Sequence, residues 1–507
     1  MLRSLYSVYL HLPSFTTGGS KYFLFGLVKA IAGPNDILLV LDGDDTLHRK
    51  DALKIVNEKY LSTGAYFTYG SYKGRWEDQI KDLPSGVREG EIDFKPREQT
   101  WVYGHPRTFK AHLLEHISEH DFKHSNGKWL TKCTERGFVY RMLELAGPSR
   151  IGFIDEKIYN YKFSATSSTL AAVSAEDREA MLHHTIYGMK PSQPLVPDLH
   201  VVLLTWKRTY LLPSQLIWLQ KQTNLEKRQV HLHVVNNNWM ETEGVEDIVN
   251  KFKEWQTSSD EAKELFSKKE STILPLKVTV THNNSDKDNN NFARFVFVDE
   301  LRRTTPLDEV VFLDDDQYWP PTFLSALLDA YQPKSISTWY GKTFSKEAAT
   351  SDTNGLSSYW QPDAGLTDII TGKVEYDSFK YGGTGGSIFD ANLWLLDSQI
   401  LRPAKDLSSW AKIDDLWASY VIDALLGWDI HRISNVLPVD IGDFLKRKTY
   451  YNELKKTIDI TIEEELLSLP IPSDGAGILA VGTYADITVD KQAMFESLQT
   501  SFKWDVA

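Results

Sequence analysis

The chain has 507 residues, enough for roughly two to four domains, and its 42% hydrophobic content is that of a globular protein with a buried core. Its formal net charge of -13 argues against nucleic-acid binding, because phosphate neutralisation needs clustered lysine and arginine. The single cysteine, Cys133, excludes an internal disulfide framework and a thiolate metal cage.

Hydropathy along the chain gives no candidate membrane span. No run reaches the about 18 apolar residues that a transmembrane helix needs, so we expect no transmembrane segment. We therefore expect a cytoplasmic protein, with a lumenal or membrane-peripheral location left open.

The first informative stretch is "ILLVLDGDDTLHRK", residues 37–50, in which a short apolar strand runs into acids. Asp42, Asp44, Asp45 and Thr46 suit a hydrolase in which Asp42 is a nucleophile. They suit equally a transferase in which the acids hold a divalent cation. The string alone does not separate these two chemistries.

Apolar runs and amphipathic segments alternate along the rest of the chain. Strand-like runs are expected at 36–42, 200–206, 230–238 and 309–316, and helices at 50–63, 135–147, 211–223, 320–332 and 415–427. Such alternation, with strands apolar on both faces, predicts an α/β fold with mainly parallel sheets. The proline-containing stretch "MKPSQPLVPDLH" at 189–200 predicts a linker between two domains.

The two halves share one order of features. Each has an apolar strand that ends in acids, and later an acid that opens an apolar helix closed by glycine, "ERGFVYRMLELAG" and "DLWASYVIDALLG". Glu135 and Asp415 open these helices 280 positions apart. The recurrence of the same order at similar spacing indicates a repeated architecture.

In serial order, "LLTWKRTYLLPSQL", "HVVNNN", "NNNFARF", "VVFLDDDQYWP", "YGGTGGSIF" and "KIDDLWASYV" resemble a GT-A type glycosyltransferase of the family-2-like kind. "LDGDDTLHRKDAL", "TYGSYKG", "YGHPRTFKAHLL" and "DEKIYNYKF" resemble the later part of a second one. The resemblance implies two Rossmann-like domains in tandem. It gives a partial domain at 1–175, a linker at 176–197, a complete domain at 198–455 and a C-terminal extension of unknown role at 456–507.

Acids after the strand "VVFL" predict a cation site, since packed carboxylates repel one another and open α/β sheets bind ligands at this end of their strands. We expect Asp314 and Asp316 to hold Mn²⁺ or Mg²⁺, which prefer oxygen ligands. The resemblance implies that an acid at this helix start removes a proton from the acceptor hydroxyl. Asp415 is the first candidate for this base and Asp414 the second. Helix capping would explain both of these acids without any catalysis.

The resemblance also implies a nucleotide-sugar donor and a glycan or other hydroxyl acceptor. The expected donor-binding residues follow strand ends or shape the wall of the site: Thr205, Arg208, Asn236, Arg294, Asp314, Asp315, Gly385 and Gly386.

The first half has matching residues, but it has only about 40 residues before its acids. Its counterparts are Asp42, Asp44, Asp45 and Glu135, and catalysis is expected in the second half. Two alternatives stay open: a phosphohydrolase of the haloacid dehalogenase type with Asp42 as nucleophile, and a non-catalytic glycan-binding protein built from decayed transferase domains.

Overall fold

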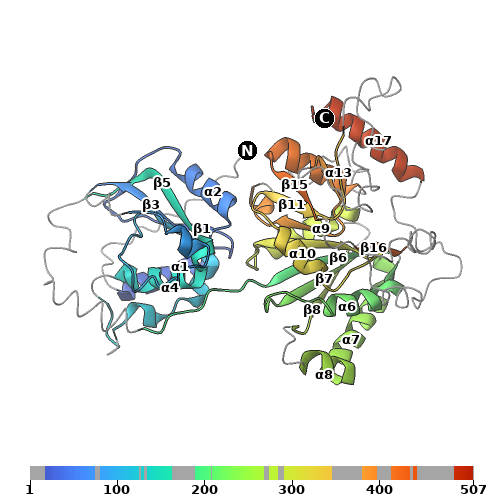
Figure 1. Cartoon of the computed structure of the whole chain (residues 1–507), viewed down its shortest axis with the longest axis horizontal. Helices are drawn as coiled ribbons and strands as arrows, with labels where there is room; N and C mark the ends of the chain where they lie inside the picture. Colours follow the sequence, from blue (N-terminus) through green and yellow to red (C-terminus); the bar gives the residue numbers. More distant parts are fainter. Residues whose placement is uncertain are drawn as a thin grey trace. The chain divides into compact units, whose positions relative to one another are not determined.

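The computed structural model describes residues 18–74, 80–124, 127–130, 134–162, 189–206, 208–267, 273–283, 290–344, 379–396, 413–433, 438–441 and 485–505 (Figure 1). The chain divides into two compact units. We call residues 4–196 with 301–306 the N-terminal unit, and residues 197–300 with 307–507 and 1–3 the C-terminal unit.

The N-terminal unit is built on a five-stranded sheet with strand order β1-β4-β3-β5-β2. Strands β3 and β5 are parallel, and the other three pairings are antiparallel. The strands are β1 (Ile37–Val40), β2 (Thr46–Leu47), β3 (Phe67–Lys73), β4 (Arg107–Lys110) and β5 (Ile151–Asn160).

Helices pack on this sheet because their apolar faces complete an aromatic core that includes Phe67, Phe109 and Phe138. The α-helices are α1 (Gly18–Ile31), α2 (Ala52–Thr63), α3 (Ser85–Arg88) and α4 (Thr134–Ala146). Short 3-10 turns are η2 (Ala111–His116), η3 (Glu119–Phe122) and η4 (Pro148–Arg150).

The C-terminal unit is built on a seven-stranded sheet with strand order β15-β11-β14-β9-β6-β7-β8. Strands β8, β7, β6 and β9 run parallel, and β14 is antiparallel to both β9 and β11. The strands are β6 (Leu199–Thr205), β7 (Val230–Asn236), β8 (Lys277–His282), β9 (Glu309–Asp314), β11 (Ser335–Thr338), β14 (Ser387–Asp390) and β15 (Asp429–Arg432). Two small ribbons pair β10 (Gln317–Tyr318) with β16 (Val439–Asp440), and β12 (Gly341–Lys342) with β13 (Tyr381–Gly382).

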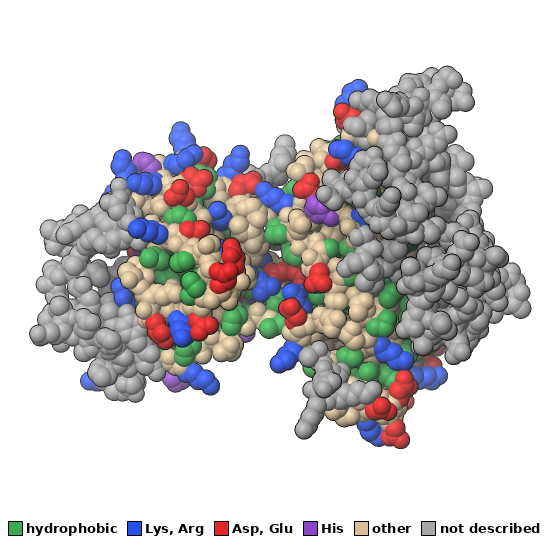
Figure 2. Space-filling view, in the orientation of Figure 1, with side chains coloured by type: hydrophobic (Ala, Val, Ile, Leu, Met, Phe, Trp, Pro, Cys, Tyr) green, Lys and Arg blue, Asp and Glu red, His purple; other side chains and the backbone are tan. Residues whose placement is uncertain are grey.

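Strands β6 and β9 are central because nearly all of their residues are apolar, and the cluster that they bury with α6 and α10 forms the main core. Figure 1 shows α6, α7 and α8 together beside β7 and β8. Acidic and basic side chains mix over α7 and α8 in Figure 2, as in the surface pair Lys251–Asp247. The helices are α6 (Leu212–Gln220), α7 (Thr242–Ser258), α8 (Asp260–Ser267), α9 (Ala293–Leu301), α10 (Phe323–Ala330), α12 (Leu393–Leu396), α13 (Asp414–Tyr420) and α17 (Ala485–Thr500). Further turns are η6 (Thr209–Leu211), η7 (Trp239–Glu241), η9 (Asn290–Phe292) and the π-helical η12 (Val421–Leu426).

The two sheets repeat one topology. The order β1-β4-β3-β5 corresponds to β9-β14-β11-β15, with antiparallel, antiparallel and parallel pairings in the same sequence. Helix α4 and the α13–η12 helix both end at a glycine in the left-handed region, Gly147 at φ 69° and Gly427 at φ 62°. The repeat expected from the sequence is therefore present in the strand order.

The predicted α/β class is confirmed, and the sheet of the C-terminal unit is mainly parallel as expected. The N-terminal sheet differs, because only β3 and β5 are parallel there. The parallel strands β6 to β8 of the C-terminal unit have no counterpart among the described residues of the N-terminal unit, so the repeat covers only the four strands β9, β14, β11 and β15. Residues 176–188 of the expected linker and 456–484 of the expected extension lie outside the described residues. No described helix combines the length and apolarity needed to cross a bilayer.

Candidate functional site

Strands β6 and β9 form a topological switch point. From β6 the chain continues to β7 and β8 on one side and then returns to β9 on the other side of β6. Ligands of open α/β sheets bind at such points, outside the carboxyl ends of the strands. Thr205 ends β6 and Asp314 ends β9, so the expected acids and the first expected donor-binding residue lie at this edge.

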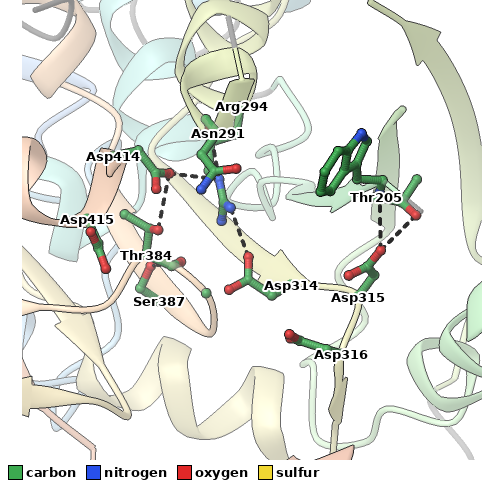
Figure 3. Close-up of polar contacts among 12 residues, drawn as sticks. Thr205, Asn291, Arg294, Asp314, Asp315, Asp316, Thr384, Ser387, Asp414 and Asp415 are labelled. Atoms are coloured by element: carbon green, nitrogen blue, oxygen red, sulfur yellow. Dashed lines mark hydrogen bonds and ion pairs between the residues drawn. The ribbon is translucent and has the colours of Figure 1, made fainter. Parts of the chain in front are cut away.

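Asp315 ties the ends of these two strands together (Figure 3). Its carboxylate accepts hydrogen bonds from the Thr205 hydroxyl at 2.9 Å, the Trp206 backbone N–H at 3.3 Å and Arg208 Nε at 2.7 Å. Arg208 also lies 3.3 Å from the carboxylate of Asp316. Burial alone would lower the pKa of Arg208, but the two acids outweigh it and raise the pKa. Arg208 is therefore a fixed cation beside the acids.

Arg294 connects the end of β9 to the start of α13. Its Nη2 donates to Asp314 Oδ1 at 2.8 Å, and its Nε lies 3.1 Å from Asp414 Oδ2. The Thr384 hydroxyl also donates to Asp414, at 3.2 Å. Figure 3 shows Thr384, Asp414, Arg294 and Asp314 in one connected group. Burial raises the pKa of Asp414 to about 6, although the Arg294 charge opposes that rise.

The Arg294 side chain is 3% exposed, and its Nη1 has no hydrogen-bond partner among the described residues. A buried guanidinium nitrogen without a partner is costly in a folded protein, where buried polar groups are almost always bonded. Oxyanions such as phosphates are natural partners for this planar donor. The arrangement therefore suits a phosphate-bearing ligand.

Glycine is required in the wall of the site. A Cβ added at Gly385 would fall inside contact distance of the Asp314 carboxylate. Gly386 has φ 80°, and a Cβ there would clash with Trp339. The loop between β13 and β14 thus approaches the acid at the end of β9 as closely as a backbone can.

Asp415 lies in a different environment from Asp414. Its Oδ2 accepts hydrogen bonds from the Tyr381 hydroxyl and, at 3.1 Å, from Lys491, while Oδ1 accepts from the Leu416 backbone N–H at 2.8 Å. Burial would raise the pKa of Asp415, but the Lys491 charge and the Tyr381 hydrogen bond outweigh it and keep the pKa below its usual value. This carboxyl group is therefore ionised at neutral pH.

Asn236 belongs to a separate polar group. Its side chain accepts from the Asn238 backbone N–H at 2.8 Å and lies 3.1 Å from His282 Nδ1. These bonds shape the turn after β7, and within the described part of the chain no hydrogen bond joins the Asn236 side chain to the acids. The structure brings the other expected donor-binding residues to the β6 and β9 ends and leaves Asn236 one strand away.

Among the residues that the structure describes, no group of three or more His, Cys, Asp and Glu side chains is arranged to hold a metal ion. A cation that keeps waters and takes ligands from substrate phosphates needs fewer protein ligands. The Asp314 carboxylate is 34% exposed and uses Oδ1 for Arg294. Among the described residues the structure shows no formed metal site at Asp314 and Asp316, and these two carboxylates stay the ligands that the sequence predicts.

Comparisons with known proteins return solved structures only. No protein-family model matches the chain, and no curated protein matches it. The chain is similar to S. aureus TarS residues 1–349 in complex with UDP, at 17% identity and TM-score 0.28, over 61% of this chain and 76% of that one.

It is also similar to the mannosyltransferase PcManGT from Pyrobaculum calidifontis in complex with GDP-Man and Mn²⁺, at 11% identity and TM-score 0.29, over 62% of this chain and 92% of that one. GalNAc-T7 with UDP, GalNAc and Mn²⁺ matches at 10% identity and TM-score 0.28, over 47% of this chain and 42% of that one. Identities and TM-scores of this size carry no functional conclusion for this chain.

The N-terminal unit repeats part of the same charge pattern. Lys21 lies 3.5 Å from Glu135, and its charge also acts on Asp42. Burial would raise the pKa of Glu135, but Lys21 and Arg107 lower it to about 2. Lys21 thus contacts the helix-start acid and acts electrostatically on the strand-end acid, whereas Arg294 contacts both acids in the C-terminal unit.

His105 makes the N-terminal unit differ from the C-terminal unit beside the strand-end acid. It lies two residues before β4, as Gly385 lies two residues before β14. Its Nε2 is 3.8 Å from Asp42, and its ring stacks on Tyr159 with centroids 4.9 Å apart. An imidazole side chain therefore lies beside the strand-end acid here, where the C-terminal unit has a glycine.

The remaining two N-terminal acids differ in their surroundings. Asp45 accepts from the Tyr159 hydroxyl at 2.8 Å and from the Lys162 backbone N–H at 2.7 Å, whereas Asp44 is exposed. These two hydrogen bonds hold the Asp45 carboxylate in the turn after β1.

The alternative with Asp42 as a hydrolase nucleophile meets a topological difficulty. Within the described sheet, β1 is an edge strand whose one neighbour, β4, is antiparallel. All four residues of β1 are only half-buried, and Leu41 is 40% exposed. The described strands therefore form no switch point beside Asp42 of the kind at which open α/β sheets bind ligands.

Sequence reasoning missed several residues of the site. Thr384 and Tyr381 lie within the glycine-rich string that was singled out, but their roles depend on contacts with Asp414 and Asp415. Gln215 donates to the backbone carbonyls of Asp315 and Gln317, at 3.1 and 2.7 Å. Lys491 carried no signal, because it contacts Asp415 from 76 positions away.

Proposed function

We propose that the C-terminal unit is a GT-A-like glycosyltransferase that moves a sugar from a nucleotide-sugar donor to a hydroxyl acceptor with the help of a divalent cation. One observation carries this proposal: a buried arginine, Arg294, bridges Asp314 at the end of β9 and Asp414 at the start of α13, and its Nη1 has no hydrogen-bond partner among the described residues. An oxygen of the donor diphosphate would accept a hydrogen bond from Nη1.

The donor would lie along the carboxyl ends of β6 and β9. Arg208 and Arg294 provide two guanidinium groups there, each paired with acids. A diphosphate is dianionic or more, and bidentate guanidinium contacts suit it. The close approach of Gly385 lets the backbone of the β13–β14 loop pack directly against the Asp314 carboxylate.

Asp314 and Asp316 are the proposed protein ligands of the cation, which would be Mn²⁺ or Mg²⁺. Bound there, such an ion would neutralise charge that develops on the departing diphosphate. Asp315 has a separate task, since Thr205, Trp206 and Arg208 already occupy its carboxylate.

Asp415 is the proposed base that accepts the proton of the acceptor hydroxyl. Its lowered pKa keeps it in the carboxylate form at neutral pH. The adjacent Asp414 would hold Arg294 in place. A positioned base contributes on the order of 10²- to 10⁴-fold to such a step.

The proposal is tested by metal-dependent turnover. A panel of UDP- and GDP-linked sugars is incubated with the full chain, with and without Mn²⁺, and donor hydrolysis or transfer is measured. Asp316→Asn and Asp415→Asn should each lower turnover by about 100-fold or more. Asp247→Asn, which removes one partner of an exposed pair on α7, is the matched control and should leave turnover unchanged. Wild-type turnover in the first two variants would refute the assignment.

A further inference from the structure

The C-terminal helix α17 is an integral part of the C-terminal unit. Met494, Phe495 and Leu498 on its inner face are fully buried, and so is Trp504, which follows it. The Phe495 ring packs 4.7 Å from Phe344, and Trp504 Nε1 donates to Asp423 at 2.7 Å. This anchoring fixes where the polar residues of α17 point.

Lys491, one turn before this apolar face, reaches the proposed base. Its ammonium donates to Asp415 Oδ2 at 3.1 Å, and both side chains are 15% exposed. Tyr381 donates to the same oxygen. Two donors from two different elements therefore converge on one carboxylate oxygen, which leaves Oδ1 with the backbone N–H of Leu416.

We infer that Lys491 is a positioning residue for Asp415: it fixes the orientation of the carboxylate through Oδ2 and keeps it ionised, so that Oδ1 can take the acceptor proton. This inference rests on the proposed function. It gives the C-terminal extension a role in the active site that depends on an ion pair and not on its packing alone.

The charges around Asp415 show why the pair matters. Asp414 precedes it on α13, Arg294 acts on it from α9, and Lys342 faces it from β12. Burial lowers the pKa of Lys342 to about 7, and the Lys491 charge adds to that effect, so Lys342 is only partly charged at neutral pH. Without Lys491, Asp415 would be a buried carboxyl beside a second carboxylate, and both effects raise a pKa.

The test compares the pH dependence of turnover in Lys491→Met, Lys491→Gln and Lys491→Arg. Loss of the charge should move the acidic limb of the kcat profile up by at least one pH unit in the Met and Gln variants. Turnover should fall about tenfold or more at the acidic end and converge toward wild type at high pH. Lys491→Arg should keep the wild-type limb. Lys503→Met, which removes an exposed lysine after the same helix, is the control.

An unchanged acidic limb in both neutral variants would overturn the inference, as would an equal loss at every pH, since a purely structural role predicts the latter. Thermal stabilisation by the donor is measured in parallel and should be the same in wild type and all variants, because Lys491 contacts the base and not the donor site. If the wild type shows neither donor stabilisation nor turnover, the proposed function fails instead.

Discussion

Replacing Arg294 by methionine tests the electrostatic centre of the site. Methionine fills most of the same volume but leaves Asp414, which is 4% exposed, beside Asp314 with no cation between them. Removing one partner of a buried ion pair costs on the order of 3–5 kcal/mol. The Asp314 carboxylate is 34% exposed, so solvent screens its charge. Most of the free-energy cost of losing Arg294 therefore comes from Asp414.

Protonation limits that cost and makes it depend on pH. Asp414 can neutralise itself by taking a proton, and because its pKa is already about 6 in the wild type, the added cost is about 1.4 kcal/mol for each pH unit above 6. The cost that Arg294→Met adds through Asp414 is therefore at most about 1.4 kcal/mol at pH 7 and close to zero at pH 5. The folded variant binds a proton that the unfolded chain releases, so its free energy of unfolding falls as pH rises from about 4.

Native-state hydrogen exchange provides the assay, because peptides that span β9 and α13 report the local free energy of opening. Arg294→Met should lower that energy, and more at pH 7 than at pH 5. Adding Asp414→Asn should recover about half of the loss, while donor binding stays absent. Lys253→Met on the exposed face of α7 is the control. A loss under about 1 kcal/mol, equal at both pH values, would refute this account of the buried pair.

Three further outcomes are expected. Gly385→Ala should weaken donor binding in titration calorimetry by about tenfold or more, because its methyl group collides with the Asp314 carboxylate. Gly244→Ala, where nothing lies within 4 Å of the added methyl group, should leave binding unchanged. Equal affinity in both variants would contradict the steric argument. Asp42→Asn should leave turnover at the wild-type value, and a large loss would move catalysis to the N-terminal unit. His200 is buried with its pKa lowered to about 3, so the unfolded chain binds a proton that the folded one does not; stability measured by denaturant titration should fall as pH drops from 6.5, by about 3 kcal/mol at pH 4, and less in His200→Gln.

The parts of the fold that depend on local pattern could be predicted from the sequence. The run "EVVFLD" is apolar on both faces, so it had to be a central strand, and the acids after it had to lie at the sheet edge. The repeat was visible in the two helices that begin near Glu135 and Asp415 and end at a glycine. Both glycines, Gly147 and Gly427, have the left-handed conformation that the end of a helix favours.

Long-range pairing could not be predicted. Strand β1 reads as an apolar run like β9, yet it is a half-buried edge strand, because its neighbours are set by residues far along the chain. Asn236 ends a strand as Thr205 does, but its side chain bonds with the backbone of Asn238 in the turn that follows. Lys491 shows no pattern at all, since an ion pair requires only that two side chains meet in space.

The two units together suggest how one architecture can hold a complete and an incomplete site. Both have a cation paired with the helix-start acid, Lys21 with Glu135 and Arg294 with Asp414, and that cation also acts on the strand-end acid. The described part of the N-terminal unit has no counterpart of the parallel strands β6 to β8, and His105 takes the space beside Asp42. We propose that nucleotide binding is confined to the C-terminal unit.

The most direct test is the binding of Mn²⁺ in the presence of UDP or GDP, followed by the loss of the free-ion signal in electron paramagnetic resonance. The account predicts one tightly bound Mn²⁺ per chain, lost in Asp316→Asn and kept in Asp42→Asn. Tight binding that survives Asp316→Asn, or no binding by the wild-type chain with either nucleotide, would contradict it.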